Sequence, residues 1–272
     1  MHLEIYWIYI LLYILTGLFA GCLAGLLGVG GGIIVVPALA FIFEHNPVIP
    51  SSIIMHMATA SSLAIMVLTA QASARAHQQH GRVLWRLYLR MSAGLLAGAV
   101  GGVILSNILH TKTLSIIFAI FLLMISIQMF TFSGPKYRRH LPGHWGMRGV
   151  GFVIGGLSGL LGIGGGTLTI PFLIHCRVPM RGTAGVAALA SVTVALTGTL
   201  TFIITGIGTV RGVPWSIGYI YLPAVFCVGI PSMLATPWGA KLTYRLPVKT
   251  VRKVFTFFLA AVSIKMLVNS FY

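Results

Sequence analysis

The stretch GLLGVGGGIIVVPAL at residues 25–39 returns as GLLGIGGGTLTIPFL at residues 159–173, and each copy lies inside a long apolar run. Glycine at this density breaks a helix and leaves backbone N–H groups without helical partners. In a bilayer such groups must face protein or a water-filled cavity, because lipid offers them no hydrogen bonds. Two breaks at corresponding places in two halves of a chain are typical of substrate sites in membrane transporters. The repeat therefore predicts a broken-helix site near the middle of a membrane.

The composition independently places this chain in a membrane. Of its 272 residues, 57% are hydrophobic and only 7% are charged, and the mean hydropathy is +0.98. A soluble domain of this size cannot bury so much apolar surface. The net charge of +16 would suggest nucleic-acid binding in a soluble protein, but here the basic residues lie in short loops between apolar runs and act as topology signals. We therefore expect a multi-pass protein of the cell (inner or plasma) membrane that contacts the lipid bilayer and no nucleic acid.

Eight apolar segments approach the length of about 20 residues that a spanning helix needs. They cover residues 5–43, 52–74, 87–105, 114–132, 149–175, 183–207, 217–236 and 254–271, and the first and fifth contain the glycine breaks. Further landmarks repeat in the same order, such as Trp85 with Trp215. The stretch 134–147 is polar and basic, so we expect it to be a cytoplasmic linker between a first transmembrane repeat at 1–133 and a second at 148–272.

The loop charges predict how each half crosses the membrane. If all eight segments cross fully, as 4+4 spanning helices, basic loops fall on both sides, against the tendency of Lys and Arg to stay in the cytoplasm. If each broken segment instead enters and returns on its own side, every basic loop becomes cytoplasmic; only Lys112 and Arg211 face outward, and Lys265 lies within the last segment. Each half then holds a re-entrant helix hairpin and three transmembrane helices, and the odd number of crossings inverts the second half. We predict this all-α fold of two inverted repeats, with the 4+4 arrangement as the alternative because residues 5–24 alone are long enough to span.

The half-helices that follow the two breaks predict an anion site. A helix N-terminus presents free N–H groups and a positive dipole end, and two inverted copies direct both ends at one central point. Hydroxyl side chains on neighbouring segments can donate further hydrogen bonds without a buried cation. The predicted substrate-binding residues are Gly30, Gly31, Gly32, Gly164, Gly165, Gly166, Thr167, Thr59, Ser61 and Ser191. The alternatives are that the glycines only permit tight helix packing and that the hydroxyls only bond to their own helix.

Other features of the sequence have plainer interpretations. Gly94, Gly98 and Gly102 are spaced four residues apart and predict a ridge for close helix packing. Lys265 is a candidate intramembrane cation, and Cys22 lies a few residues before the first break. The chain has only two carboxylates and no catalytic or metal-ligand constellation, so we expect no enzyme activity, no cofactor and no metal.

The repeated motifs resemble the sulfite exporter TauE/SafE family of membrane transporters over essentially the whole chain. The matching residues are both glycine stretches with Pro37 and Pro171, and the runs at 58–62, 81–85, 218–223, 239–242 and 245–249. The resemblance implies a polytopic inner- or plasma-membrane protein that moves small anions, typically sulfur oxyanions or organosulfonates. The family usually has Ala-Thr-Ser in the second segment, where this chain has Ala58-Thr59-Ala60-Ser61.

We therefore expect a secondary transporter or facilitator of a small anion, a sulfite-like sulfur oxyanion or organosulfonate, held between the two breaks at the membrane midplane. The same parts would also suit an anion channel, or a membrane subunit that delivers a sulfur species to an enzyme. A homo-oligomer is also compatible with the sequence.

Overall fold

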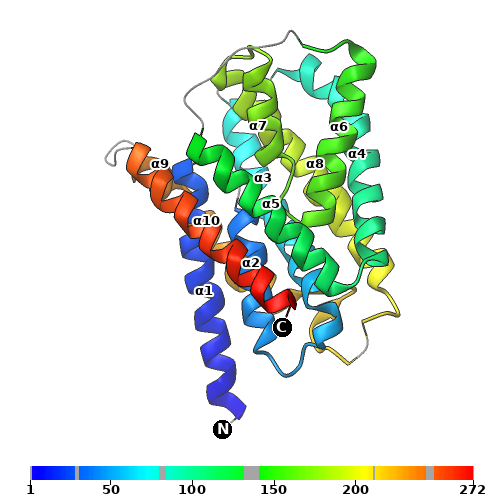
Figure 1. The fold of residues 1–272 in the computed structure, drawn as a ribbon, viewed down its shortest axis with the longest axis vertical. Helices are drawn as coiled ribbons and strands as arrows, with labels where there is room; N and C mark the ends of the chain where they lie inside the picture. The colour runs from blue at the N-terminus through cyan, green and yellow to red at the C-terminus, as the bar shows by residue number, and fades with distance from the viewer. Residues whose placement is uncertain are drawn as a thin grey trace.

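The computed structural model describes residues 2–27, 31–79, 84–131, 141–210, 212–242 and 248–271, and most of them are helical (Figure 1). The helices are α1 (His2–Leu27), α2 (Gly32–Glu44), α3 (Ile54–Gln79), α4 (Trp85–Ile108), α5 (Thr111–Thr131), α6 (His144–Leu161), α7 (Gly166–His175), α8 (Met180–Gly206), α9 (Leu222–Leu242) and α10 (Val248–Phe271). The other described elements are a 3-10 turn, η1 (Ser51–Ile53), and two short strands, β1 (Ser216–Ile217) and β2 (Ile220–Tyr221).

Seven of the described helices are long and apolar enough to cross a membrane, namely α1, α3, α4, α5, α8, α9 and α10. The helices α2 and α7, which follow the glycine breaks, have 13 and 10 residues and are too short to cross by themselves. Large apolar side chains such as Trp7, Ile204 and Phe257 are exposed on the outside of the bundle, as expected of a surface that faces lipid. The chain is therefore an all-α, multi-pass membrane protein, as the composition predicts.

The two broken segments return to opposite ends of the bundle. The helices α1 and α2 run antiparallel, because the Tyr9 hydroxyl in the first half of α1 donates to the carbonyl oxygen of His45, just after α2. In Figure 1 the start of α1 and the end of α2 lie toward the lower end. The start of α6 and the end of α7 lie at the upper end, where Leu141 and residues 176–179 line a shared pocket with the start of α4.

The helices pair in a pattern that is unchanged when the two halves are exchanged. Helix α4 packs along α6 and α1 packs along α9, while α3 packs on α8 and α5 on α10. Match each helix of α1–α5 with the helix five places later, α1 with α6, α2 with α7, and so on to α5 with α10. Under this exchange the α4–α6 contact becomes the α9–α1 contact and the reverse, while the α3–α8 and α5–α10 contacts each stay the same. The most enclosed of the seven long helices is α3, and its partner α8 comes from the other half, so the centre of the bundle is shared between the halves.

The predicted glycine ridge is confirmed as a close contact between α4 and α6. A β-carbon built at Gly98 would lie 2.1 Å from the carbonyl oxygen of Phe152, and one at Gly102 would lie 2.1 Å from that of Gly156. Carbon atoms in van der Waals contact are about 3.5–4.0 Å apart, so any side chain here would force the two backbones to separate. The small residues therefore set the distance between α4 and α6.

Gly98→Ala is expected to destabilise the protein by about 2 kcal/mol or more, because the added methyl group overlaps the α6 backbone. Gly101→Ala is the matched control: it makes the same change on the same helix, where a built β-carbon meets no atom within 4 Å. Thermal unfolding of both purified variants in one detergent measures the difference. Equal melting temperatures would contradict the tight α4–α6 contact.

Two boundaries differ from those predicted from the sequence. The predicted segment 217–236 begins with an antiparallel hairpin of β1 and β2, and α9 starts only at Leu222. Gly218 at the turn has a φ of +57°, and a β-carbon there would lie 2.6 Å from the carbonyl oxygen of Ile203, so the turn packs on the end of α8. Apolar composition alone does not reveal such a turn. Helix α6 begins at His144, inside the stretch predicted as linker, because the Pro-Gly pair before it suits a helix start.

Candidate functional site

The two glycine breaks, one from each half, touch at the centre of the bundle. Helix α6 is followed by Gly162, and both Gly162 and Gly164 have a φ of +69°, which glycine adopts without strain. Helix α2 begins just after Gly31, and a β-carbon built at Gly32 would lie only 2.7 Å from the Cα of Ile163. Glycine therefore lets one broken segment pass directly against the other.

Hydroxyl side chains of α3 and α8 satisfy the backbone of the second break. Ser62 Oγ donates to the carbonyl oxygen of Gly162 at 2.8 Å, and Ser191 Oγ accepts from the N–H of Gly166 at 2.8 Å. Both serines are buried. Because Ser191 uses its oxygen as the acceptor in this bond, its hydroxyl proton can still donate to a ligand.

A cavity of about 190 Å³ lies beside this crossing, between the two halves. Its walls come from α1, α3 and Gly31, which precedes α2, in the first half, and from α7, α8 and α9 in the second. The lining residues are Ala24, Gly31, Met66, Thr69, Ala70, Ser73, Gly166, Ile170, Ala184, Ala187, Ala188, Ser191, Ser232 and Thr236. None of these side chains is charged, and the polar ones are all hydroxyls. A solute in this cavity would be held by neutral donors and helix dipoles rather than by ion pairs.

The cavity extends from the breaks toward one end of the bundle. On α3 the lining residues run from the middle of the helix toward its C-terminal end, and on α8 they lie in the N-terminal half. That is the upper end in Figure 1, where α3 ends and α8 begins. The same end is basic, because Arg86, Arg90 and Arg177 line a pocket there.

Aromatic side chains lie on the other side of the breaks. Tyr13 of α1, Phe43 of α2 and Tyr221 of β2 form a triangle with ring centroids 5.7–6.5 Å apart. All three side chains are buried, and the Tyr221 N–H donates to Ser61 Oγ on α3 at 3.0 Å. The triangle therefore lies between the breaks and the lower end of the bundle.

The structure brings some of the predicted site residues to the cavity and leaves others beside it. Three line the cavity: Gly31, Gly166 and Ser191. Three others pack where the breaks meet their neighbours: Gly32, Gly164 and Gly165. Thr167 is buried in the first turn of α7, and Gly30 lies outside the described residues. Some glycines of the breaks thus line the cavity, and others pack against the residues that surround it.

Thr59 and Ser61 make backbone hydrogen bonds away from the cavity lining. Thr59 Oγ1 donates to the carbonyl oxygens of Met55 and His56 at 2.9 and 3.0 Å, which is the own-helix bonding that the sequence left as an alternative. Ser61 receives the Tyr221 N–H described above. Both residues are fully buried, so in this conformation they support the packing around the breaks.

The residues of the cavity wall that sequence reasoning missed include one thioether and four hydroxyls: Met66, Thr69, Ser73, Ser232 and Thr236. Met66 matters most, because its thioether lies between the breaks; a β-carbon built at Gly164 would lie 2.4 Å from Met66 Cε, and one at Gly32 would lie 2.9 Å from Met66 Sδ. The signal that would have found these residues is spacing. Met66, Thr69 and Ser73 are three and four residues apart on α3, and Ser232 and Thr236 are four apart on α9. Residues at this spacing fall on one face of a helix.

Lys265 and Cys22 lie away from this cavity. Lys265 lines a separate pocket that includes residues of α2 and α10. Cys22 lies in the α1–α9 contact, where a β-carbon built at Gly239 would lie 2.0 Å from the Cys22 carbonyl oxygen. Among the described residues, no three His, Cys, Asp or Glu side chains gather in a way that could hold a metal ion.

Comparisons with known proteins agree with this architecture. The family model described as sulfite exporter TauE/SafE matches residues 13–266. A probable membrane transporter protein of Haemophilus influenzae is 32% identical over 261 residues, which cover 95% of this chain and 98% of the relative. Probable membrane transporter proteins of Methanocaldococcus jannaschii and Bacillus subtilis are 25% and 27% identical, over 94% and 71% of this chain and 94% and 78% of their own lengths. No solved structure matches the chain significantly.

Proposed function

Because the chain belongs to the sulfite exporter TauE/SafE family of membrane transporters, we propose that it is a secondary transporter or facilitator of a small anion, which binds in the cavity beside the two glycine breaks. We propose a sulfur oxyanion or organosulfonate, such as sulfite, as the substrate. One observation carries the proposal: the N-termini of α2 and α7, one from each half, border the same uncharged cavity through Gly31 and Gly166.

The chemistry of the wall favours an anion. Each helix N-terminus carries the equivalent of about half a positive charge and backbone N–H donors that lack helical acceptors. Ser191 can add a hydroxyl proton, and no lining side chain is a carboxylate that would repel the ligand. An oxyanion offers acceptor atoms in several directions at once, which suits donors that arrive from two helices and a hydroxyl. Because no lysine or arginine lines the cavity, release does not require breaking a buried ion pair.

We propose that the two halves are inverted repeats and that the basic end of the bundle is cytoplasmic. The exchange symmetry of the helix contacts and the opposite directions of the α1–α2 and α6–α7 hairpins support the first point. The excess of Lys and Arg in the loops at one end supports the second. In this orientation the cavity belongs to an inward-facing state, and the triangle of Tyr13, Phe43 and Tyr221 forms the outer barrier.

Transport in this proposal follows from one half rocking against the other around the central cavity. The helices that border the cavity come from both halves, so relative motion would close it on one side and open the aromatic triangle on the other. An inside-negative membrane potential drives each negative charge outward by about 2.3 kcal/mol per 100 mV. Export of a dianion could then proceed without a coupling ion.

Purified protein in liposomes loaded with sulfite, thiosulfate or sulfoacetate tests this function. We expect efflux that saturates with internal substrate, accelerates when a potassium diffusion potential is made inside-negative, and is absent from protein-free liposomes. Efflux that is insensitive to the imposed potential would contradict the electrical drive, and no efflux of any of the three would contradict the substrate class.

The same liposomes separate a carrier from an anion channel. A carrier exchanges labelled internal anion for unlabelled external anion, so adding external substrate should speed label release. A channel shows no such acceleration, because both anions move independently. The closed aromatic triangle favours a carrier.

A further inference from the structure

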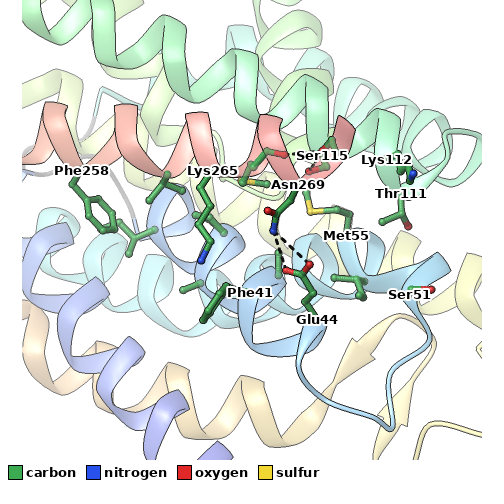
Figure 2. Close-up of a pocket in the computed structure, with 18 residues that line it drawn as sticks. Phe41, Glu44, Ser51, Met55, Thr111, Lys112, Ser115, Phe258, Lys265 and Asn269 are labelled. Carbon is green, nitrogen blue, oxygen red and sulfur yellow. Dashed lines mark hydrogen bonds between the residues drawn. The ribbon is translucent and has the colours of Figure 1, made fainter. Parts of the chain in front are cut away.

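A second pocket lies on the lower part of the bundle, apart from the cavity at the breaks. It has a volume of about 440 Å³ and is bordered by α2, by the η1–α3 junction, by the start of α5 and by the second half of α10 (Figure 2). It shares no lining residue with the central cavity. Its wall is mostly apolar, but it also contains one charged side chain from each of three helices: Glu44 of α2, Lys112 of α5 and Lys265 of α10.

The pocket changes from apolar to charged along the direction of the helices. On α10, Phe258 and Val262 lie toward the middle of the helix and are followed by Lys265 and then by Asn269 near its end. Since a helix rises 1.5 Å per residue, Lys265 lies about 10 Å beyond Phe258. On α2 the order is the same, from Ile34 at its start to Glu44 at its end. The walls formed by α2 and α10 therefore both change from apolar to charged along the helix, which matches the order of acyl chain and headgroup in a lipid.

Lys265 and Glu44 carry opposite charges and lie at different positions along the pocket. Lys265 Nζ lies over the ring of Phe41, 3.7 Å from its centroid. Glu44 lies almost one turn farther along α2, and its carboxylate accepts a hydrogen bond from Asn269 Nδ2 at 3.4 Å. Asn269 in turn lies one turn, about 6 Å, beyond Lys265 on α10. Figure 2 shows the Glu44–Asn269 contact beside Lys265. Along α2 and α10 the wall is therefore apolar, then positive at Lys265, then negative at Glu44, and Lys112 of α5 adds a second cation beyond Asn269.

We propose that this pocket binds a phospholipid whose headgroup carries a primary ammonium and no carboxylate, that is, a phosphatidylethanolamine. Such a lipid has the complementary order: an acyl chain, then a negative phosphate, then a positive ammonium. Its chain would lie along Phe258 and Val262, its phosphate would meet Lys265, and its ammonium would replace Asn269 as the donor to Glu44. The bond from Asn269 is long for a hydrogen bond, so a charge-assisted donor is the stronger partner for this carboxylate.

The chemistry of the pocket discriminates among lipids. A primary ammonium can donate hydrogen bonds to a carboxylate, whereas the quaternary ammonium of phosphatidylcholine has no N–H to donate. An anionic lipid such as phosphatidylglycerol would satisfy Lys265 but would bring no cation to Glu44. A free phosphate would leave the apolar wall uncovered. The arrangement therefore selects for the whole amphiphile with both headgroup charges.

Native mass spectrometry of the delipidated full-length protein with added lipids tests the proposal. We expect phosphatidylethanolamine to bind at least about fivefold more tightly than phosphatidylcholine or phosphatidylglycerol of the same chain length, because only it pairs both charges. Equal affinity for the three lipids, or preference for phosphatidylglycerol, would overturn the proposal. As a competition test, sn-glycerol-3-phosphate is added far in excess of the lipid. We expect it not to reduce lipid binding, because it lacks the acyl chains that contact the apolar wall.

Three substitutions separate the contributions of the charges. Glu44→Gln is expected to abolish the preference for ethanolamine over choline while leaving choline-lipid binding unchanged. Lys265→Gln is expected to weaken both lipids by about fivefold or more, since both carry the phosphate. Lys253→Gln, near the other end of α10, is the matched control and should change neither. All three positions are on helix surfaces with exposed side chains, so the variants should keep the wild-type melting temperature without lipid. A Lys265→Gln variant that binds both lipids like the wild type would also overturn the proposal, whatever the outcome of the transport assays.

Discussion

Gly31→Leu is expected to abolish binding of the anion while leaving the protein folded. Gly31 lines the cavity, and a β-carbon built there meets only Val35 Cγ2 at 3.9 Å, so there is room at this position for the start of a side chain that borders the cavity. Its backbone lies at φ −70° and ψ −19°, a conformation open to every residue. The leucine would occupy space needed by the ligand and would cover the N–H donors at the start of α2. We expect at least about a hundredfold loss of affinity, or roughly 2.7 kcal/mol.

The measurement is equilibrium binding of labelled sulfite to the purified protein, together with its melting temperature. Gly101→Leu is the matched control, because it adds the same side chain at an exposed glycine of α4 with no atom within 4 Å of its built β-carbon. A graded series is also expected, in which Gly31→Ala loses less affinity than Gly31→Leu because it fills less of the cavity. Wild-type affinity in Gly31→Leu would remove the cavity from consideration as the substrate site.

Ser191→Ala is expected to lower anion affinity by about ten- to a hundredfold, through two losses at once. The hydroxyl that borders the cavity disappears, and the buried N–H of Gly166 loses its acceptor at 2.8 Å. Leaving a buried donor unpaired costs about 1–3 kcal/mol, part of which will appear as lower stability. The loss of the hydroxyl that borders the cavity should lower the affinity for the anion without lowering the stability further.

Ser62→Ala separates the structural effect from the binding effect. Ser62 makes the same kind of bond to the second break, donating to the Gly162 carbonyl oxygen at 2.8 Å, but it does not line the cavity. Both variants should lose a similar amount of thermal stability, and only Ser191→Ala should lose affinity by tenfold or more. Equal losses of affinity in the two variants would show that Ser191 acts only by supporting the break.

The breaks could be predicted from the sequence because their cause is local. A run of glycines interrupts a helix whatever surrounds it, so the starts of α2 and α7 follow from the pentads themselves. The Gly94, Gly98 and Gly102 ridge was also readable, since a spacing of four puts small residues on one helix face. Each of these features needs only the sequence of one segment.

The choice of hydroxyls at the cavity could not be predicted in this way. Thr59, Ser61 and Ser191 all lie on the helices beside the breaks, yet only Ser191 borders the cavity. Thr59 turns its hydroxyl back to its own helix, and Ser61 binds the backbone of β2, which comes from the other half. Met66 was overlooked because an apolar residue in an apolar helix carries no signal of its own. Its place between the breaks depends on how α3 is rotated about its axis.

The sequence by itself determined that this chain crosses a membrane several times, and its two copies of one glycine motif indicated where helices break. Hydropathy and glycine density act within a single segment and need no partner, because lipid enforces helix formation wherever the chain is apolar. The tertiary structure alone decided that the two breaks touch, that one uncharged cavity receives both helix ends, and that α2 and α10 form an amphiphilic pocket. These features depend on the rotation and tilt of each helix, which packing against neighbouring helices sets and no single segment encodes.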